Sequence, residues 1–403
     1  MRKRPFHGWT ITWALAITQT VGYGVLFYAF GVFVAPMEGE LGWTRSQVSG
    51  AFSLALLCSG LVALPAGRLA DRHGARGLMT LGSLLGGVLV FTWSFVESLS
   101  GLYLMQAGIG LAMGLSLYEV AFTVLAVWFR RRRRLALLIV TLVAGLASTI
   151  FVPLCTWLLT FLSWREALQL LALLHLLLSV PLHAAVLRRS PTEIGSYPDG
   201  AEAAQPERSV TAGVAVRGGG FWWLACAFAL DRITVMAVAA HGVVILLERG
   251  HPPALVAGVL GFVGVAQLGG RLLFLPSAQR NDLRLLTAII FGLHSAALLL
   301  ILSVPQIWAL WGFAGLFGLS NGAGTLARAA LIAETYGPAN YGSISGTVAT
   351  LVAFVQVIGP LAVGGLRDLS GSYDVALVLL MAVSLTAAFA ITQSARPERV
   401  LSV

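Results

Sequence analysis

Three ionisable side chains stand inside long apolar stretches of the sequence, where they could do chemistry: Glu119, Asp231 and Arg271. A charged group away from water is expensive unless it is paired or faces a cavity, so such residues usually serve a function. A guanidinium keeps its charge and its planar fork matches a carboxylate. A carboxyl group in an apolar cavity can hold a proton near neutral pH. These residue types predict anion binding at Arg271 and proton transfer at Glu119 and Asp231.

Depth along a helix supports this interpretation. Glu119 precedes Arg130 by 11 residues, about 16 Å at the helical rise, and Arg271 precedes Arg280 by nine residues, about 13 Å. The alternative is that Arg271 forms a structural ion pair with Asp231 or Glu119. Anion binding and ion pairing can also alternate within one transport cycle.

Two further arginines have open roles. Arg232 adjoins Asp231, and because neighbours on a helix point about 100° apart, at most one of the two faces a cavity. Arg328 lies closer to the end of its apolar stretch, where its side chain can reach the interface.

The composition shows what must position these residues. Of the 403 residues 58% are hydrophobic and 11% are charged, where a soluble domain has about a quarter charged. Disorder, coiled coils and disulfide scaffolds are therefore excluded. The three cysteines show no metal-binding spacing and no P-loop is present, so we expect no enzyme, no metal and no cofactor.

Twelve apolar stretches are long enough to cross a bilayer as helices. Small residues such as glycine, which is abundant here, let helices in lipid approach closely. The sequence predicts an all-α membrane protein with twelve transmembrane helices in two pseudo-symmetric six-helix bundles. The predicted spans are 8–36, 44–66, 76–96, 99–128, 134–160, 164–187, 221–248, 253–276, 282–304, 305–334, 341–366 and 373–394.

The net charge of +9 predicts orientation rather than nucleic-acid binding, because the basic residues cluster between the spans. With a cytoplasmic N-terminus, nineteen of the 26 Lys and Arg residues lie on the inner side: Arg2, Lys3, Arg4, Arg68, Arg72, Arg76, Arg130 to Arg134, Arg188, Arg189, Arg208, Arg217, Arg280, Arg284, Arg396 and Arg399. Both termini are thus expected in the cytoplasm of an inner (plasma) membrane protein. The run Arg130 to Arg134 favours a topology signal over binding of anionic lipid.

The chain divides into two similar parts. Residues 188–220 are polar and rich in Pro and Gly, which predicts a cytoplasmic linker between an N-terminal bundle, 1–187, and a C-terminal bundle, 221–403. A shift of 208 positions superposes Glu40 and Gly42 on Glu248 and Gly250, Gly50 on Gly258, Arg72 on Arg280, and Gly110 and Gly114 on Gly318 and Gly322. Parallel repeats of this kind occur in carriers that bind substrate near the bilayer midplane.

The loop after the second span carries a recognisable motif. Residues 67–76 read GRLADRHGAR, which resembles the signature loop G-x-L-A-D-R-x-G-x-R of the major facilitator superfamily. Gly67 would permit close helix contact. Asp71 would cap a helix N-terminus or pair with Arg72 or Arg76, and Gly74 would suit a left-handed turn.

A finer resemblance, to bacterial monocarboxylate and oxalate/formate-type members, extends over nearly the whole chain. It rests on Phe30 to Phe33, Gly42 to Arg45, Trp128-Phe129, Trp164 to Ala167, Gly270-Arg271 and Asp368 to Tyr373. The resemblance implies that Arg271 binds the substrate anion. The sequence departs from that family pattern at Leu275, where the second loop copy would have glycine, at Gln267, where an acid is common, and in having Lys3 as its only lysine.

Other polar residues could line the cavity. Tyr118, Tyr28, Tyr23 and Asn321 offer hydroxyl or amide groups beside apolar surface, although span packing also explains them. For Tyr118 the family resemblance adds support. His175, His183, His241 and His294 could relay protons, with helix packing as the favoured alternative.

Together these observations predict a secondary active transporter, a monomer in the lipid bilayer, that moves a small organic anion with a proton by alternating access. The alternative is efflux or antiport of a drug or other organic metabolite. Residues 145–153, GLASTIFVP, lack the Gly-Pro ending of the drug-antiporter signature, which disfavours proton-coupled drug antiport.

Overall fold

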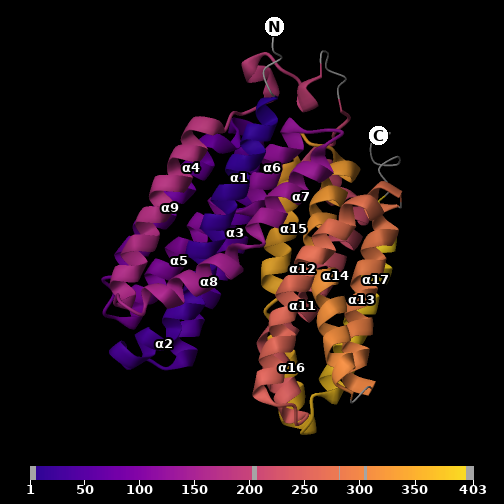
Figure 1. Cartoon of the computed structure of the whole chain (residues 1–403). Coiled ribbons are helices and arrows are strands. Elements are labelled where there is room, and N and C mark those ends of the chain that lie inside the picture. The colour runs from indigo at the N-terminus through magenta and orange to yellow at the C-terminus, as the bar shows by residue number, and fades with distance from the viewer. Residues whose placement is uncertain (1–5, 202–206, 281, 304–305, 396–403) are drawn as a thin grey trace. The chain divides into compact units, whose positions relative to one another are not determined.

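The computed structural model describes residues 6–201, 207–280, 282–303 and 306–395, and every regular element among them is a helix (Figure 1). The elements are α1 (His7–Tyr23), η1 (Gly24–Tyr28), α2 (Ala29–Leu41), α3 (Arg45–His73), α4 (Ala75–Trp93), α5 (Leu99–Ser116), α6 (Tyr118–Trp128), α7 (Arg133–Ala144), α8 (Ala147–Leu158), α9 (Trp164–Val186), η2 (Pro191–Ile194), η3 (Pro198–Gly200), α10 (Ala212–Arg217), α11 (Gly219–Glu248), α12 (Pro253–Arg280), α13 (Leu283–Ser303), α14 (Ile307–Tyr336), α15 (Tyr341–Val355), α16 (Ile358–Ser370) and α17 (Asp374–Thr392).

The predicted spans coincide with helices. Within the described ranges, eleven helical segments are long and apolar enough to cross a membrane. The tenth predicted span corresponds to α14, a helix of 30 residues that is less apolar because it carries Asn321, Arg328 and Glu334. A helix satisfies its backbone hydrogen bonds internally, which is what a chain crossing hydrocarbon requires. The prediction of an all-α membrane protein is confirmed.

Some basic residues used for the orientation cannot be placed. Arg2, Lys3, Arg4, Arg396 and Arg399 lie outside the described residues, as does the side chain of Arg280. The predicted orientation therefore stays a prediction.

Several spans are not continuous helices. The first is interrupted by the π-helix η1, the fourth changes direction at Leu117 between α5 and α6, and the eleventh consists of α15 and α16. In contrast, α11, α12, α13 and α14 are unbroken. Broken helices at membrane depth need partners for the backbone groups that they release, and they often lie at functional positions.

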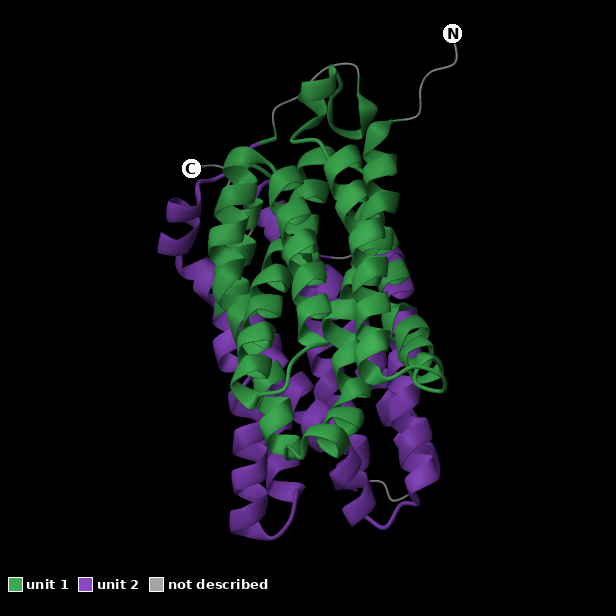
Figure 2. Cartoon of the chain, turned by 90° about the vertical axis from the view of Figure 1, so that its left-hand side faces the viewer, with its two compact units in different colours: residues 1–207, 338–350 green, residues 208–337, 351–403 purple. Residues whose placement is uncertain are grey.

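The chain forms two compact units, coloured separately in Figure 2. Unit 1 consists of residues 1–207 and 338–350, and unit 2 of residues 208–337 and 351–403. The first part of α15 thus belongs to unit 1 and the rest of the eleventh span to unit 2. The predicted division into 1–187, 188–220 and 221–403 stays a prediction.

Glycines permit close helix contacts at equivalent places in the two units. In unit 1, Gly110 of α5 lies so near α3 that an added Cβ would come within 2.1 Å of the Ala55 carbonyl oxygen. In unit 2, Gly318 of α14 lies against α12 in the same way, 2.5 Å from the carbonyl oxygen of Val263. Both members of the second pair follow the first by the 208-residue shift found in the sequence. The repeat therefore preserves a packing contact between equivalent helices.

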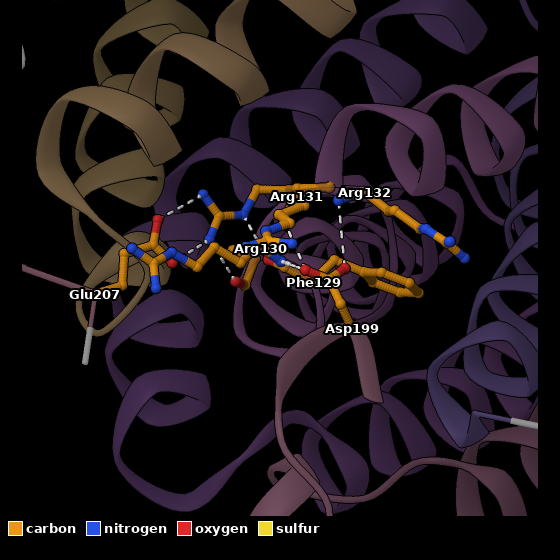
Figure 3. Close-up of polar contacts among 8 residues, drawn as sticks. Phe129, Arg130, Arg131, Arg132, Asp199 and Glu207 are labelled. Atoms are coloured by element: carbon orange, nitrogen blue, oxygen red, sulfur yellow. Dashed lines mark hydrogen bonds and ion pairs between the residues drawn. The ribbon is translucent and has the colours of Figure 1, made fainter. Parts of the chain in front are cut away.

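The segment after α9 folds onto the basic run, as Figure 3 shows. Asp199, the one described non-glycine residue with positive φ (60°), accepts hydrogen bonds from the backbone N–H groups of Arg130, Arg131 and Arg132 at 3.1, 2.6 and 3.3 Å. Arg133 is buried and pairs with Glu207, with Nη2 2.8 Å from the carboxylate oxygen Oε2. Of the run Arg130 to Arg134, Arg133 therefore holds the segment after α9 against α7 through its ion pair with Glu207.

Candidate functional site

In unit 1, the break in the fourth span positions two of the predicted residues. α5 ends at Ser116, Leu117 is extended (φ −89°, ψ −160°), and Tyr118 and Glu119 open α6. Gln19 of α1 donates its amide N–H to the Ser116 carbonyl oxygen at 2.8 Å, so that a side chain satisfies a backbone group at the break. The geometry places Glu119 in the first helical turn, where the positive end of the helix dipole favours a negative charge.

Glu119 has a partner in a distant part of the sequence. Its Oε2 accepts a hydrogen bond of 2.7 Å from the hydroxyl of Ser345, a buried residue in the unit 1 portion of α15. Glu119 itself is half-buried. The carboxyl group is thus held by a neutral donor that can serve both its ionised and its protonated form.

The predicted tyrosines lie beside these breaks. Tyr23 ends α1 immediately before the π-helix, and its ring centroid lies 4.6 Å from that of Tyr118. Tyr118 also stacks on Phe122 at 4.9 Å. Tyr28 is the last residue of the π-helix and its ring contacts Phe27. All three tyrosines are half-buried, and Tyr23 and Tyr118 form one aromatic cluster next to Glu119.

In unit 2, Asp231 lies near the middle of α11 and is buried. Its Oδ1 is 2.8 Å from Nδ1 of His294, which lies near the middle of α13 and is 1% exposed. The neighbouring Arg232 is half-buried. The carboxylate–imidazole pair joins two helices that are separated by 63 positions in sequence.

Arg271 is a buried arginine of α12 in unit 2, 7% exposed. The preceding Gly270 brings α12 against α14, because an added Cβ there would come within 2.0 Å of the Leu319 carbonyl oxygen. Such backbone contact fixes the point from which the guanidinium extends. Asn321, half-buried in α14, follows two residues after Leu319 in the same unit. Arg328 lies further along α14 and is also half-buried.

The signature loop connects α3 to α15 within unit 1. Asp71 accepts hydrogen bonds from the backbone N–H groups of Gly342 (2.9 Å) and Ser343 (2.7 Å), and from the Ser343 hydroxyl (2.6 Å). This arrangement caps the N-terminus of α15 with a carboxylate. Gly67 lies where an added Cβ would approach the Gly342 carbonyl oxygen to 1.9 Å, so only glycine permits this helix crossing.

The rest of the loop forms a tight turn. Gly74 has φ +80°, a conformation that L side chains rarely adopt. Arg72 and Arg76 are exposed, and Arg76 donates to the backbone carbonyl of Ala184 in α9 at 2.7 Å. Asp71 is therefore directed at α15 by its hydrogen bonds, while these two arginines face the surface of unit 1.

Three of the four singled-out histidines have packing contacts in the structure. In unit 1, His183 bridges Thr18 and Ser83 at 2.9 Å each, and His175 is buried near it in α9. In unit 2, His241 contacts the Tyr373 hydroxyl and the Pro360 carbonyl. The fourth, His294, bonds to a carboxylate, that of Asp231.

Sequence reasoning missed two partners. Ser345 carries no distinguishing signal, because serine is common where membrane helices pack. The sequence indicates His294 as one of four possible proton relays, with helix packing favoured, but its pairing with Asp231 depends on α11 and α13 presenting these faces to each other.

Comparison with known proteins places this chain in a family. Residues 15–360 match the model of the Major Facilitator Superfamily. The chain is 27% identical to Monocarboxylate transporter 13 of Bos taurus over 385 residues, 92% of this chain and 85% of that protein. Among solved structures, a variant of the E. coli Fucose:proton symporter FucP matches with a TM-score of 0.70 at 13% identity, over 97% of this chain and 100% of that one. The human organic anion transporter MFSD10 (TETRAN) matches with a TM-score of 0.73 at 15% identity, over 96% and 100%.

The helical fold, the signature loop and the family match agree on one class of protein, a multi-pass membrane transporter rather than an enzyme. The chain belongs to the major facilitator superfamily and is related to the monocarboxylate transporters within it.

Proposed function

We propose that this protein is a secondary active transporter that carries a small organic anion together with a proton by alternating access. Arg271 is the residue on which the proposal rests. This guanidinium is 7% exposed within a membrane-spanning helix, where it keeps its charge, and its planar fork matches the carboxylate of a small organic anion. The names of its relatives, a monocarboxylate transporter and a fucose:proton symporter, fit such a substrate and such coupling.

Tyr23, Tyr28, Tyr118 and Asn321 are the further residues that we propose for substrate binding. Tyr23, Tyr28 and Tyr118 in unit 1 offer hydroxyl groups and aromatic faces, and Asn321 in unit 2 offers an amide. Such mixtures of apolar and polar groups are usual in pockets for small molecules. The tyrosines would accommodate an apolar substrate tail, while Arg271 would set the preference for an anion.

Proton coupling would be the task of the membrane-embedded carboxyl groups. Glu119 and Asp231 lie in different units, and each has a hydrogen-bonding partner that tolerates a change of protonation state. In this scheme the substrate anion binds Arg271 while a carboxyl group takes up a proton, so that the loaded carrier gains no net charge. A neutral load lowers the cost of the conformational change in an apolar surrounding.

The carrier would act as a monomer in the inner (plasma) membrane, with both termini in the cytoplasm. The positions of the basic residues between the spans support this orientation. No nucleic acid is expected as a partner.

The first experiment is a transport screen in proteoliposomes with lactate, pyruvate, oxalate, formate and amino acids, with and without a pH gradient. Arg271→Ala should reduce uptake of the transported acid by about 30-fold or more, because a charge-assisted bidentate contact is lost. Arg271→Lys should recover part of it, since lysine keeps the charge without the fork. Arg249→Gln, which removes an arginine paired with Asp374 at a helix end, is the matched control and should leave uptake unchanged. Equal uptake by Arg271→Ala and wild type would refute the anion site.

The second experiment tests coupling. Glu119→Gln and Asp231→Asn should abolish accumulation driven by a pH gradient and spare exchange of labelled for unlabelled substrate, because exchange needs no net proton movement. Proton-driven uptake that is unchanged in both variants would end the coupling scheme. Export of a drug without transport of any acid would favour the efflux alternative.

A further inference from the structure

We propose that Asp231 and His294 together form a proton-binding site in unit 2, in which the proton is taken up at Nε2 of His294 and Asp231 serves as its charge partner. The inference rests on the proposed function and refines it: in unit 2 the proton of that cycle is carried by the imidazole of His294, while the carboxyl group of Asp231 stays ionised. His294 is thereby given a role that neither the family match nor the relatives assign to it.

The geometry of the pair fixes where the first proton lies. Nδ1 of His294 is 2.8 Å from Oδ1 of Asp231. A carboxylate can only accept hydrogen bonds, so with Asp231 ionised the Nδ1 atom carries the hydrogen and donates it. The pair then has a net charge of −1, and Nε2 carries a free lone pair.

Nε2 of His294 is buried without a hydrogen-bond partner among the described residues. His294 is 1% exposed, and among the described residues no side chain or backbone group is within hydrogen-bonding distance of its Nε2. The ring of Phe317 in α14 lies against the imidazole, with centroids 4.6 Å apart. Nε2 is therefore the one nitrogen of the pair that can accept a proton without displacing an existing hydrogen bond.

Charge balance supplies the driving force. When a proton leaves a hydronium ion and bonds to Nε2, the net charge of the pair rises from −1 to 0, and the bond between Nδ1 and Oδ1 becomes an ion pair. A neutral pair is less costly than a net negative one in an apolar surrounding. The site is thus built to bind one proton with little change in geometry.

The helices packed against α11 and α13 carry further charged groups. Arg232 adjoins Asp231 on α11, and Thr234 of α11 bonds to the neutral Ser384 of α17. The remaining charged residues on α12, α14, α16 and α17 are Arg271, Arg280, Arg328, Glu334, Arg367, Asp368 and Asp374, and α13 itself carries Arg284 near its start. Among those of them whose side chains the structure describes, Arg271 is the buried one, and an anion bound there would add a negative charge to the same unit.

A direct test observes the protonation of His294 without any substrate. The full-length protein is labelled with ¹⁵N-histidine, reconstituted in liposomes and examined by NMR between about pH 5 and pH 8, the range in which histidine charge changes are usual. His294→Asn identifies the His294 signals, and Asp231→Asn removes the charge partner. His241, on the same helix as Asp231 but bonded to Tyr373 and Pro360, is the internal control.

In the wild type, we expect Nδ1 protonated and Nε2 bare at high pH, and a doubly protonated ring as the pH falls. At about pH 6 the doubly protonated fraction should be at least about threefold smaller in Asp231→Asn, with the signals of His241 unchanged. A His294 ring that stays singly protonated throughout, or that protonates equally in both proteins, would overturn the inference.

Transport separates this inference from the proposed function. His294→Asn keeps an amide N–H near the position of Nδ1 and cannot bind a proton, so the link to Asp231 survives. With ¹⁴C-lactate as the probe, accumulation driven by a pH gradient should fall at least about tenfold while lactate exchange continues, since a general proton carrier contributes at least that much. His241→Asn should behave as the wild type. Undiminished accumulation in His294→Asn would refute this inference and leave the proposed function intact. The absence of any acid transport by the wild type would refute the proposed function. The NMR experiment would then still test proton binding at His294 independently.

Discussion

The two units of this protein carry their predicted site residues in different structural settings. In unit 1, Tyr118 and Glu119 open a helix that begins at a break, and Tyr23 precedes a π-helix. In unit 2, Asp231 and Arg271 lie within unbroken helices. Breaks expose backbone groups and allow small changes of shape, whereas continuous helices hold a charge at constant depth. In unit 1 the polar side chains therefore lie where the backbone can adapt, whereas in unit 2 the charged side chains are held in place by continuous helices.

The internal repeat shows that the membrane-embedded charged residues of one unit have no charged counterpart in the other. By the 208-residue shift, Asp231 corresponds to Tyr23, Arg271 to Ala63 and His294 to Gly86. Glu119 in turn corresponds to Ala327. Each of these four membrane-embedded residues therefore occurs in one copy of the repeat and not in the other. Gly110 and Gly114, which lie at the helix crossing in unit 1, in contrast recur as Gly318 and Gly322 in unit 2. Duplication has preserved the packing and not the chemistry.

The largest effect should follow from breaking the packing that the units share. Gly110→Ala in unit 1 and Gly322→Ala in unit 2 would each place a Cβ about 2 Å from a backbone oxygen, of Ala55 and Gln267 respectively. Each should cost about 2 to 3 kcal/mol, because backbone must move to make room. Thermal unfolding of the purified variants in detergent measures the loss.

Each of these variants has a control in its own unit. Gly31→Ala in α2 and Gly292→Ala in α13 meet no atom within 4 Å and should change stability by less than about 1 kcal/mol. If the packed and the open glycines tolerated alanine equally, the close helix packing at Gly110 and Gly322 would be wrong.

A smaller effect should distinguish the two copies of the loop after the second helix of each half. Asp71→Ala removes the cap of α15 and should cost about 1 to 2 kcal/mol. Gln279, at the equivalent position in unit 2, is exposed, and Gln279→Ala should be neutral. Hydrogen exchange at the amides of Gly342 and Ser343 should speed up in the first variant only; unchanged protection there would contradict the capping role.

The smallest effects concern the ion pairs of two equivalent acids, Glu40 and Glu248. Arg165 binds Glu40 and also donates to the carbonyl oxygens of Ser94 (2.7 Å) and Val96 (3.1 Å). Arg367 binds Glu248 with both side chains well exposed, at 41% and 37%. Chemical denaturation should therefore show a loss of about 1 to 2 kcal/mol for Arg165→Gln and less than about 0.5 kcal/mol for Arg367→Gln. Equal losses would mean that the carbonyl contacts of Arg165 contribute nothing.

Much of the fold was predictable because each span is determined by local sequence. An apolar run of about 20 residues in a bilayer has to be helical, and the charges that flank it mark its ends. The breaks inside the spans were not predicted. Leu117 is as apolar as its neighbours, and the break there becomes intelligible only once Gln19 is seen to satisfy the freed carbonyl of Ser116.

The candidate site was predictable in its members but not in its pairings. Depth and residue type pointed to Glu119, Asp231 and Arg271, since charge within hydrocarbon is conspicuous in a sequence. Their partners lie 226 positions away for Glu119 and 63 for Asp231. No local sequence pattern predicts contacts between residues so far apart in the chain.

Local sequence was enough to predict the helical spans, the positions of charge along them and membership of the major facilitator superfamily. The reason is that hydrophobic periodicity, charge and the spacing of glycines act over one helix at a time. Tertiary structure alone decided that Asp71 caps α15, that Ser345 holds Glu119 and that His294 meets Asp231. Those contacts depend on which faces of distant helices meet, and that is settled by the packing of each whole unit.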